Sequence, residues 1–312
     1  MNPAWSVIFL TTLIGAGQGL FLTMAGVDAA VRFGVIAPVA ADFFVTGSLV
    51  ALLLLVCGLG ASFLHLGHPE RAWRAIAMWR TSWLSREVIV LPAFIGSVAA
   101  YGYAHAQALS CAGWIAAAGV VLCLALFVCT AMIYICLKFL QEWHTPLTFV
   151  NFLVLGTASG VLLAAVLAAT AWPKIATVLA IAAGVFTAIG ALTRGLALSR
   201  NAGLRPKSTT QSAIGIANPK IAQKAQGAMG GSFNTREFFH GRTAAVVTAV
   251  KWFFLLATFA LPLVLIALAM ANGAMPWLAV AFGVQYAGLL AERWFFFAQA
   301  RHPQNLYYQA IS

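Results

Sequence analysis

Two neighbouring segments of the chain carry residues whose chemistry suits proton transfer at a membrane edge. His65 begins one of them, residues 65–71, and Glu87 ends the other, residues 79–87. An imidazole titrates near neutral pH and can hydrogen-bond a quinone carbonyl, while a carboxylate exchanges protons with water. His65 would lie at the end of one apolar helix and Glu87 in the first turn of the next. We therefore expect both side chains to converge on one proton-active pocket between two helices.

Each of these residues also has a simpler structural interpretation. His65 would fit a helix end where its ring bonds backbone carbonyls, and Glu87 would complement the dipole at a helix start. The basic and aromatic residues around them fit cytoplasmic anchors and an interfacial aromatic belt. The residues concerned are Arg71, Arg74, Arg80, Arg86, Trp73, Trp79 and Trp83. Spacing alone leaves both interpretations open.

The amino-acid composition indicates the environment that surrounds these residues. Of 312 residues, 62% are apolar and only 8% are charged, against about 25% charged in ordinary soluble domains. Residues 88–137 and 252–291 contain no Asp, Glu, Lys or Arg. Each run is long enough for two membrane-spanning helices of about 20 residues and lacks the alternation of barrel strands. The chain is therefore predicted to be an all-α integral membrane protein.

The apolar runs predict eight transmembrane helices in a single domain, residues 1–312. Their expected ranges are 5–27, 43–64, 84–103, 113–137, 146–171, 173–198, 244–270 and 277–298. Residues 199–243 form a long polar loop between the sixth and seventh helices. Because eight is even, both termini are expected on one side of the membrane.

The positive charges predict which side that is. Sixteen of the 18 Lys and Arg residues fall on the side of the termini, and only Arg32 and Lys174 fall on the other. Because cytoplasmic loops collect Lys and Arg, both termini and the 199–243 loop are predicted to be cytoplasmic. This asymmetry also accounts for the formal net charge of +11.

Several other chemistries are disfavoured by the sequence. All six His residues fall at helix ends or in loops, whereas haem b requires paired His within helices, so we predict no haem and no metal site. The small residues 15–19 predict close helix packing, with Gln18 able to hydrogen-bond across the bundle. A secondary transporter stays an alternative, since Gln18, Thr130 and Asn151 are polar residues within apolar segments.

Three segments resemble a known family of membrane subunits. Residues 65–72, residues 82–87 and the C-terminal residues 292–298 are similar to the membrane-anchor subunit of dimethyl sulfoxide reductase. More broadly, they resemble the anchors of bacterial molybdopterin oxidoreductases. The resemblance covers nearly the whole chain, and residues 82–87 are its most specific part. It implies a multi-pass protein of the bacterial cytoplasmic membrane.

The resemblance implies an oxidoreductase complex of three subunits. A molybdopterin catalytic subunit and an iron–sulfur subunit would hold those cofactors, and the anchor would exchange electrons with ubiquinone or menaquinone as its substrate. His65 and Glu87 would take the catalytic roles. Quinone binding would involve His65, Arg71, Trp83, Arg86 and Glu87, and partner docking would involve Arg74, Arg80, Arg236, Phe238 and Phe239.

The predicted orientation and two further segments indicate which kind of anchor subunit the chain resembles most. Residues 2–12 and 232–239 are most similar to the anchors of cytoplasmic sulfite-oxidising complexes. That similarity implies electron flow from sulfite, through the partner subunits, to quinone near His65. Anchors of dimethyl sulfoxide reductase-like and phenylacetyl-CoA oxidoreductase complexes are the alternatives.

Overall fold

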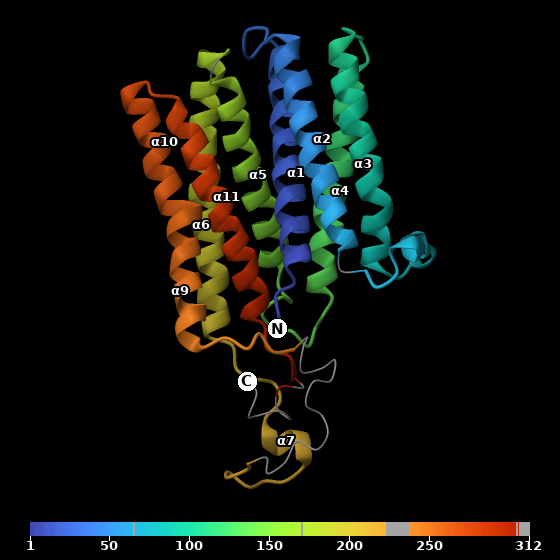
Figure 1. Ribbon diagram of the computed structural model, residues 1–312, viewed down its shortest axis with the longest axis vertical. Coiled ribbons are helices and arrows are strands. Elements are labelled where there is room, and N and C mark those ends of the chain that lie inside the picture. The colour runs from blue at the N-terminus through green and yellow to red at the C-terminus, as the bar shows by residue number, and fades with distance from the viewer. Residues whose placement is uncertain (65, 170, 223–237, 304, 306–312) are drawn as a thin grey trace.

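The computed structural model describes residues 1–64, 66–169, 171–222, 238–303 and 305. Across these residues the secondary structure is helical, and long helices lie side by side in one bundle (Figure 1). Seven of the helices in the described ranges are long and apolar enough to cross a membrane. They are α1 (Trp5–Arg32), α2 (Ala41–Phe63), α3 (Trp83–Ala106), α4 (Ala112–Ile135), α5 (Pro146–Ala168), α6 (Pro173–Ala202) and the interrupted helix Ala244–Asn272.

The helix expected at 277–298 also forms. It is α11 (Pro276–Ala298), and it runs beside α5 and α9 in the bundle (Figure 1). It is not one of the seven apolar helices, and it carries the charged pair Glu292 and Arg293 near its end. The prediction of an all-helical membrane protein is confirmed, and seven of the eight predicted crossings are supported.

The seventh helix is not the continuous helix that the sequence predicts. It consists of α9 (Ala244–Leu255), the π-helical turn η3 (Leu256–Ala260) and α10 (Leu261–Asn272). Pro262 has no N–H to donate to the carbonyl of Thr258 four residues earlier, which explains the break. Gln285 of α11 donates to that carbonyl at 3.3 Å and to Thr187 Oγ1 at 3.0 Å. The break is therefore held by side chains of α6 and α11.

Helix α1 crosses α5 at the small residues that the sequence pattern singled out. A Cβ atom added at Gly19 would overlap the backbone of Gly156, and one added at Gly160 would overlap the backbone of Gly19. The two helices thus approach through their backbones, as small residues allow in membrane bundles. This contact places α1 at the centre of the bundle, against α2, α4 and α5.

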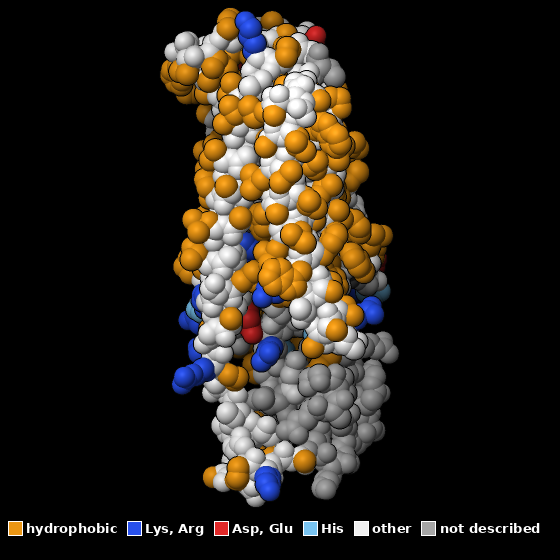
Figure 2. Space-filling view, turned by 90° about the vertical axis from the view of Figure 1, so that its left-hand side faces the viewer, with side chains coloured by type: hydrophobic (Ala, Val, Ile, Leu, Met, Phe, Trp, Pro, Cys, Tyr) orange, Lys and Arg blue, Asp and Glu red, His pale blue; other side chains and the backbone are white. Residues whose placement is uncertain are grey.

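The two ends of the bundle differ. The lower end in Figure 1 carries the 3₁₀ helix η1 (Pro69–Met78), the short helix α7 (Thr210–Ile214) and the start of the chain. The Met1 amine donates to the Ala300 carbonyl at 2.8 Å, so the beginning of the chain lies beside the end of α11. Figure 2 shows hydrophobic side chains along the helices and Lys and Arg gathered toward the lower end, called the basic end below.

Candidate functional site

Glu87 is placed inside the bundle by the start of α3. Ser82 caps this helix by accepting a hydrogen bond from the Ser85 backbone N–H at 3.3 Å. Glu87 therefore lies one turn into the helix, on its buried face, and is only 8% exposed. The Thr130 hydroxyl of α4 donates to Glu87 Oε1. The sequence expectation that Glu87 lies in the first turn of the third helix is wrong, because α3 begins at Trp83 and its first turn holds no acidic residue. Glu87 lies just beyond that turn, with its side chain directed into the bundle.

Glu87 opens onto a cavity of about 470 Å³ between α1, α3, α4, α5 and α11. Its lining combines apolar walls with a few placed polar groups, as small-molecule sites do. Phe127 and Phe152 supply aromatic walls. The polar side chains that line the cavity are Thr11, Thr12, Gln18, Glu87, Thr130, Ser159 and Arg293.

The cavity extends well into the membrane-spanning part of the bundle. Gln18 lies 13 residues after the start of α1, or about 20 Å along the helix axis at 1.5 Å per residue. Its side-chain amide donates to the Cys123 carbonyl at 3.0 Å, which fixes it between α1 and α4. The site therefore joins a carboxylate near the basic end to an amide near mid-bundle.

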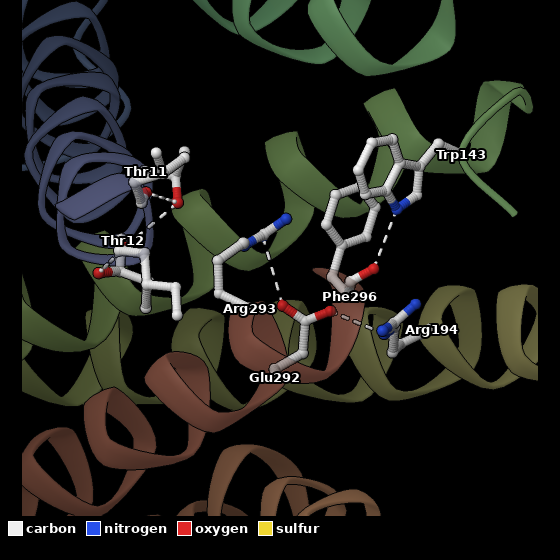
Figure 3. A network of polar contacts seen from close by, with 9 residues as sticks. Thr11, Thr12, Trp143, Arg194, Glu292, Arg293 and Phe296 are labelled. Carbon is white, nitrogen blue, oxygen red and sulfur yellow. Dashed lines mark hydrogen bonds and ion pairs between the residues drawn. The ribbon is translucent and has the colours of Figure 1, made fainter. Parts of the chain in front are cut away.

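Arg293 enters the cavity from α11 and is held by a buried charge cluster (Figure 3). Glu292 lies between two guanidinium groups, 2.8 Å from Arg194 Nε and 3.4 Å from Arg293 Nη2. The Arg293 guanidinium also lies 3.9 Å from the Phe152 ring centroid. All three charged residues are at most 5% exposed. Such a cluster fixes the position of Arg293 because each charge would be costly to bury alone.

The other predicted quinone-site residues of α3 and η1 lie outside this cavity. Arg86 donates to the carbonyls of Trp79 at 2.9 Å and Arg80 at 2.7 Å, and its guanidinium covers the Trp83 ring at 4.1 Å. Arg71 is exposed on η1. Arg86 and Trp83 thus hold the connection from η1 to α3, and of the α3 residues proposed for quinone binding only Glu87 faces the cavity.

His65 lies outside the described residues, and so does the expected helix start at 234–237. The predicted convergence of His65 with Glu87 therefore stays a prediction. The described part of the 199–243 loop includes α7 and the segment that leads into α9.

The residues predicted for partner docking fall into two groups. Arg74 and Arg80 lie on or beside η1, where their guanidinium groups cover Trp73 and Trp79 at 5.6 and 5.3 Å. These groups form an exposed basic and aromatic surface at the basic end.

The second group lies near the start of α9. Phe239 is only 6% exposed, and Phe238 stacks on His302 with ring centroids 3.8 Å apart. Both phenylalanines make contacts within the chain, and their role in partner docking stays a prediction. Arg236 lies outside the described residues.

Sequence reasoning missed the part of the site that α11 contributes. Arg293 of α11 lines the cavity together with Phe152 of α5, and neither was among the predicted site residues. The signal was present, because Glu292 and Arg293 are the only charged residues between 252 and 300. Thr130 was noted as a polar exception, but its role as a partner of Glu87 depends on the packing of α3 against α4.

The fold and cavity describe a helical membrane protein with one basic end and a polar cavity inside the bundle. The sequence profile of the DMSO reductase anchor subunit (DmsC) family matches residues 1–306, so the chain belongs to this family. It is also 54% identical, over 328 aligned positions covering all of both chains, to a sulfite dehydrogenase subunit of Allochromatium vinosum. The resemblance drawn from residues 65–72, 82–87 and 292–298 is confirmed.

Proposed function

We propose that this anchor subunit transfers electrons from an iron–sulfur partner subunit to membrane quinone, with the Glu87 cavity as the quinone site. The observation that carries the proposal is the buried Glu87–Thr130 pair in a cavity that also presents Arg293. Membership of the anchor family supports the role within an oxidoreductase complex.

The residues present fit a quinone headgroup chemically. The headgroup is a flat, largely apolar ring with oxygen atoms on opposite sides, which requires aromatic walls and polar partners at two separated positions. Phe127 and Phe152 provide the walls. Glu87 with Thr130 and Arg293 provide polar groups from α3, α4 and α11, and Gln18 lies deeper in α1.

Reduction of the quinone requires two electrons and two protons for each molecule. The electrons would come from the iron–sulfur partner, and the quinone oxygens would each gain one proton. Glu87 is suited to pass protons to the quinone because it is a carboxyl group held at the cavity wall. Arg293 would stabilise negative charge that develops on the ring oxygen during reduction, because its own charge is fixed and buried.

Sulfite is the proposed source of the electrons. The relative from Allochromatium vinosum is named as a subunit of a sulfite dehydrogenase, and the identity of 54% spans both chains. We propose that a molybdopterin subunit oxidises sulfite and that its electrons reach the anchor through the iron–sulfur subunit. His65 is retained as a second quinone-site residue from the sequence prediction.

The proposed orientation places the basic end in the cytoplasm, with eight crossings and both termini inside. Sixteen of the 18 basic residues support this assignment. An alkaline phosphatase domain fused after Ser312 should be inactive, because this enzyme folds only outside the cytoplasm. Strong phosphatase activity would overturn the orientation.

The test of the quinone site is Glu87→Gln in the complete complex. We expect sulfite-dependent quinone reduction to fall by about 10²-fold or more, the range for a positioned proton-transfer group. Sulfite oxidation with ferricyanide, which takes electrons from the partner subunits, should be unchanged. Wild-type quinone turnover in Glu87→Gln would show that the cavity is not the quinone site. The transporter alternative would require solute flux in vesicles containing the anchor alone.

A further inference from the structure

A second cavity lies beside the first and has no part in the function proposed above. It lies between the 136–145 connection, α5, α6 and α11, and it has room for about one water molecule. Phe152 and Arg293 line both cavities, so the two spaces are separated by these side chains. Glu142 lines the second cavity and is itself only half-buried at the basic end. This space therefore leads from the basic end toward the Glu87 cavity.

Several buried polar atoms in the walls of the second cavity need hydrogen-bond partners. Asn151 Oδ1, Arg194 Nη2 and Arg293 Nε are buried and have no hydrogen-bond partner within the described chain. Buried polar atoms without protein partners are normally satisfied by ordered water, and a water molecule needs two to four such partners. All three residues line this cavity, which makes it polar enough to hold water.

Among the residues that line the cavity, positive and negative charges balance only when Glu142 is ionised. Arg194 and Arg293 bring two positive charges, and Glu292 between them supplies one negative charge. Glu142 supplies the second negative charge from the same wall. A proton that binds Glu142 would leave one positive charge in excess. Negative charge that develops on a quinone beyond Arg293 would then favour movement of that proton inward.

The segment that carries Glu142 is fixed to α6. Arg200 Nη1 donates to the Gln141 carbonyl at 3.1 Å, and Arg200 Nη2 donates to the His144 carbonyl at 3.5 Å. Trp143 is buried and donates from Nε1 to the Phe296 carbonyl of α11 at 2.9 Å (Figure 3). Glu142 thus has a defined place at the mouth of the cavity.

The charged groups near Glu142 come from every element that packs around it. The Met1 amine interacts electrostatically with it, and His144 and Arg200 lie in or against its own segment. From the interior, the charged residues of the shared cavity are Arg194, Glu292 and Arg293.

We propose that the second cavity is a hydrated inlet that carries protons from the basic end to the Glu87 cavity, with Glu142 as the proton-accepting group at its mouth. This inference rests on the quinone reduction proposed above. A proton from bulk water binds the Glu142 carboxylate and passes through a water molecule held among Asn151, Arg194 and Arg293. It then reaches Glu87 and finally a quinone oxygen, which has gained its electron from the iron–sulfur partner.

The first test is Glu142→Gln in the complete complex. Sulfite-dependent quinone reduction should fall by about 10- to 100-fold, with a steeper fall toward high pH, where protons are scarce. The apparent KM for quinone and ferricyanide-linked sulfite oxidation should be unchanged. Glu142→Asp should recover most of the rate because it keeps a carboxylate. The control is Asp42→Asn, an exposed acid on the opposite end of the bundle, which should behave as wild type.

A second variant tests whether water in the second cavity is needed, and it leaves the Glu142 carboxylate unchanged. Ala197 lines the second cavity and is 4% exposed, so Ala197→Val would fill space without changing any charge. It should slow quinone reduction with the same pH dependence. Wild-type rates in Glu142→Gln and Ala197→Val, with Glu87→Gln inactive, would overturn the inlet and leave the quinone site intact. Wild-type rates in all three variants would overturn the proposed function itself.

Discussion

The hydroxyl of Thr130 on α4 donates a hydrogen bond to the carboxylate of Glu87 on α3, 43 residues earlier in the chain. Both side chains are 8% exposed and line the same cavity. In a low-dielectric interior a buried carboxylate needs such a partner, and the partner also fixes its direction. The pair therefore orients Glu87 toward the cavity.

Substitutions of Thr130 can distinguish the effect of its hydrogen bond from the effect of its side-chain volume. Thr130→Val has nearly the same volume but leaves Glu87 without its donor, which costs about 1–3 kcal/mol for a buried group. We expect quinone-linked turnover to fall by about tenfold, while Thr130→Ser keeps most of the activity. Steady-state rates of the intact complex measure the effect. Equal rates in the valine and serine variants would mean that the hydroxyl has no role.

The cluster of Arg194, Glu292 and Arg293 should dominate the stability of the basic end. Glu292→Gln removes the shared negative charge and leaves two buried guanidinium groups uncompensated, which should cost about 3–5 kcal/mol. The measurement is the midpoint of thermal unfolding in detergent. The control is Glu70→Gln, whose side chain is 62% exposed, and it should change stability by less than about 1 kcal/mol. Similar midpoints for both variants would contradict this prediction.

The crossing of α1 and α5 should not tolerate a methyl group. Gly160→Ala would force the Gly19 backbone away, and overpacking of this kind costs about 1–3 kcal/mol. Gly26→Ala is the matched control, because a Cβ there meets nothing within 4 Å in the described chain and alanine favours a helix. Reduced yield and a lower unfolding midpoint are expected for Gly160→Ala alone. A normal midpoint in that variant would show that the helices can separate without loss.

The docking of the segment around His302 should depend on pH. Burial lowers the pKa of His302, and the positive Met1 amine acts in the same direction. The His302 ring packs against Phe139 and Phe238. Because the pKa in the docked state is below the ordinary value of about 6.5, the undocked state binds the proton more readily. Docking is therefore fully favourable above about pH 6.5 and weakens as the pH falls below it.

Hydrogen exchange measures this docking directly. Backbone amides of residues 238–242 should exchange faster at pH 5.5 than at pH 7.5, after correction for the intrinsic pH dependence of exchange. His302→Phe keeps the aromatic contacts but cannot be protonated, so its corrected exchange should not change with pH. A pH dependence that persists in this variant would assign the effect to another group, such as His240, whose pKa is also lowered by burial.

Local sequence was enough to establish the membrane environment, the positions of the helices and the family. Long runs without charge can only be buried in lipid or protein, and the residue patterns at 65–72 and 82–87 are local in the chain. The start of α3 at Trp83 was predicted within one residue from the apolar run that follows it. The crossing at residues 15–19 was also predicted, because small residues have a consistent role between membrane helices.

Which polar residues share a site follows from tertiary packing alone. Arg293 and Glu87 are 206 positions apart, and no local pattern indicates that α11 packs against α5 beside α3 and α4. The break at Thr258 likewise depends on Gln285 of another helix, although Pro262 gave a local reason for it. Uniformly apolar helices have no amphipathic face that would reveal their partners, so neighbours are selected by side-chain packing and a few buried hydrogen bonds. For that reason, sequence reasoning found Glu87 and a pocket beside it, but not the residues of α5 and α11 that line the cavity.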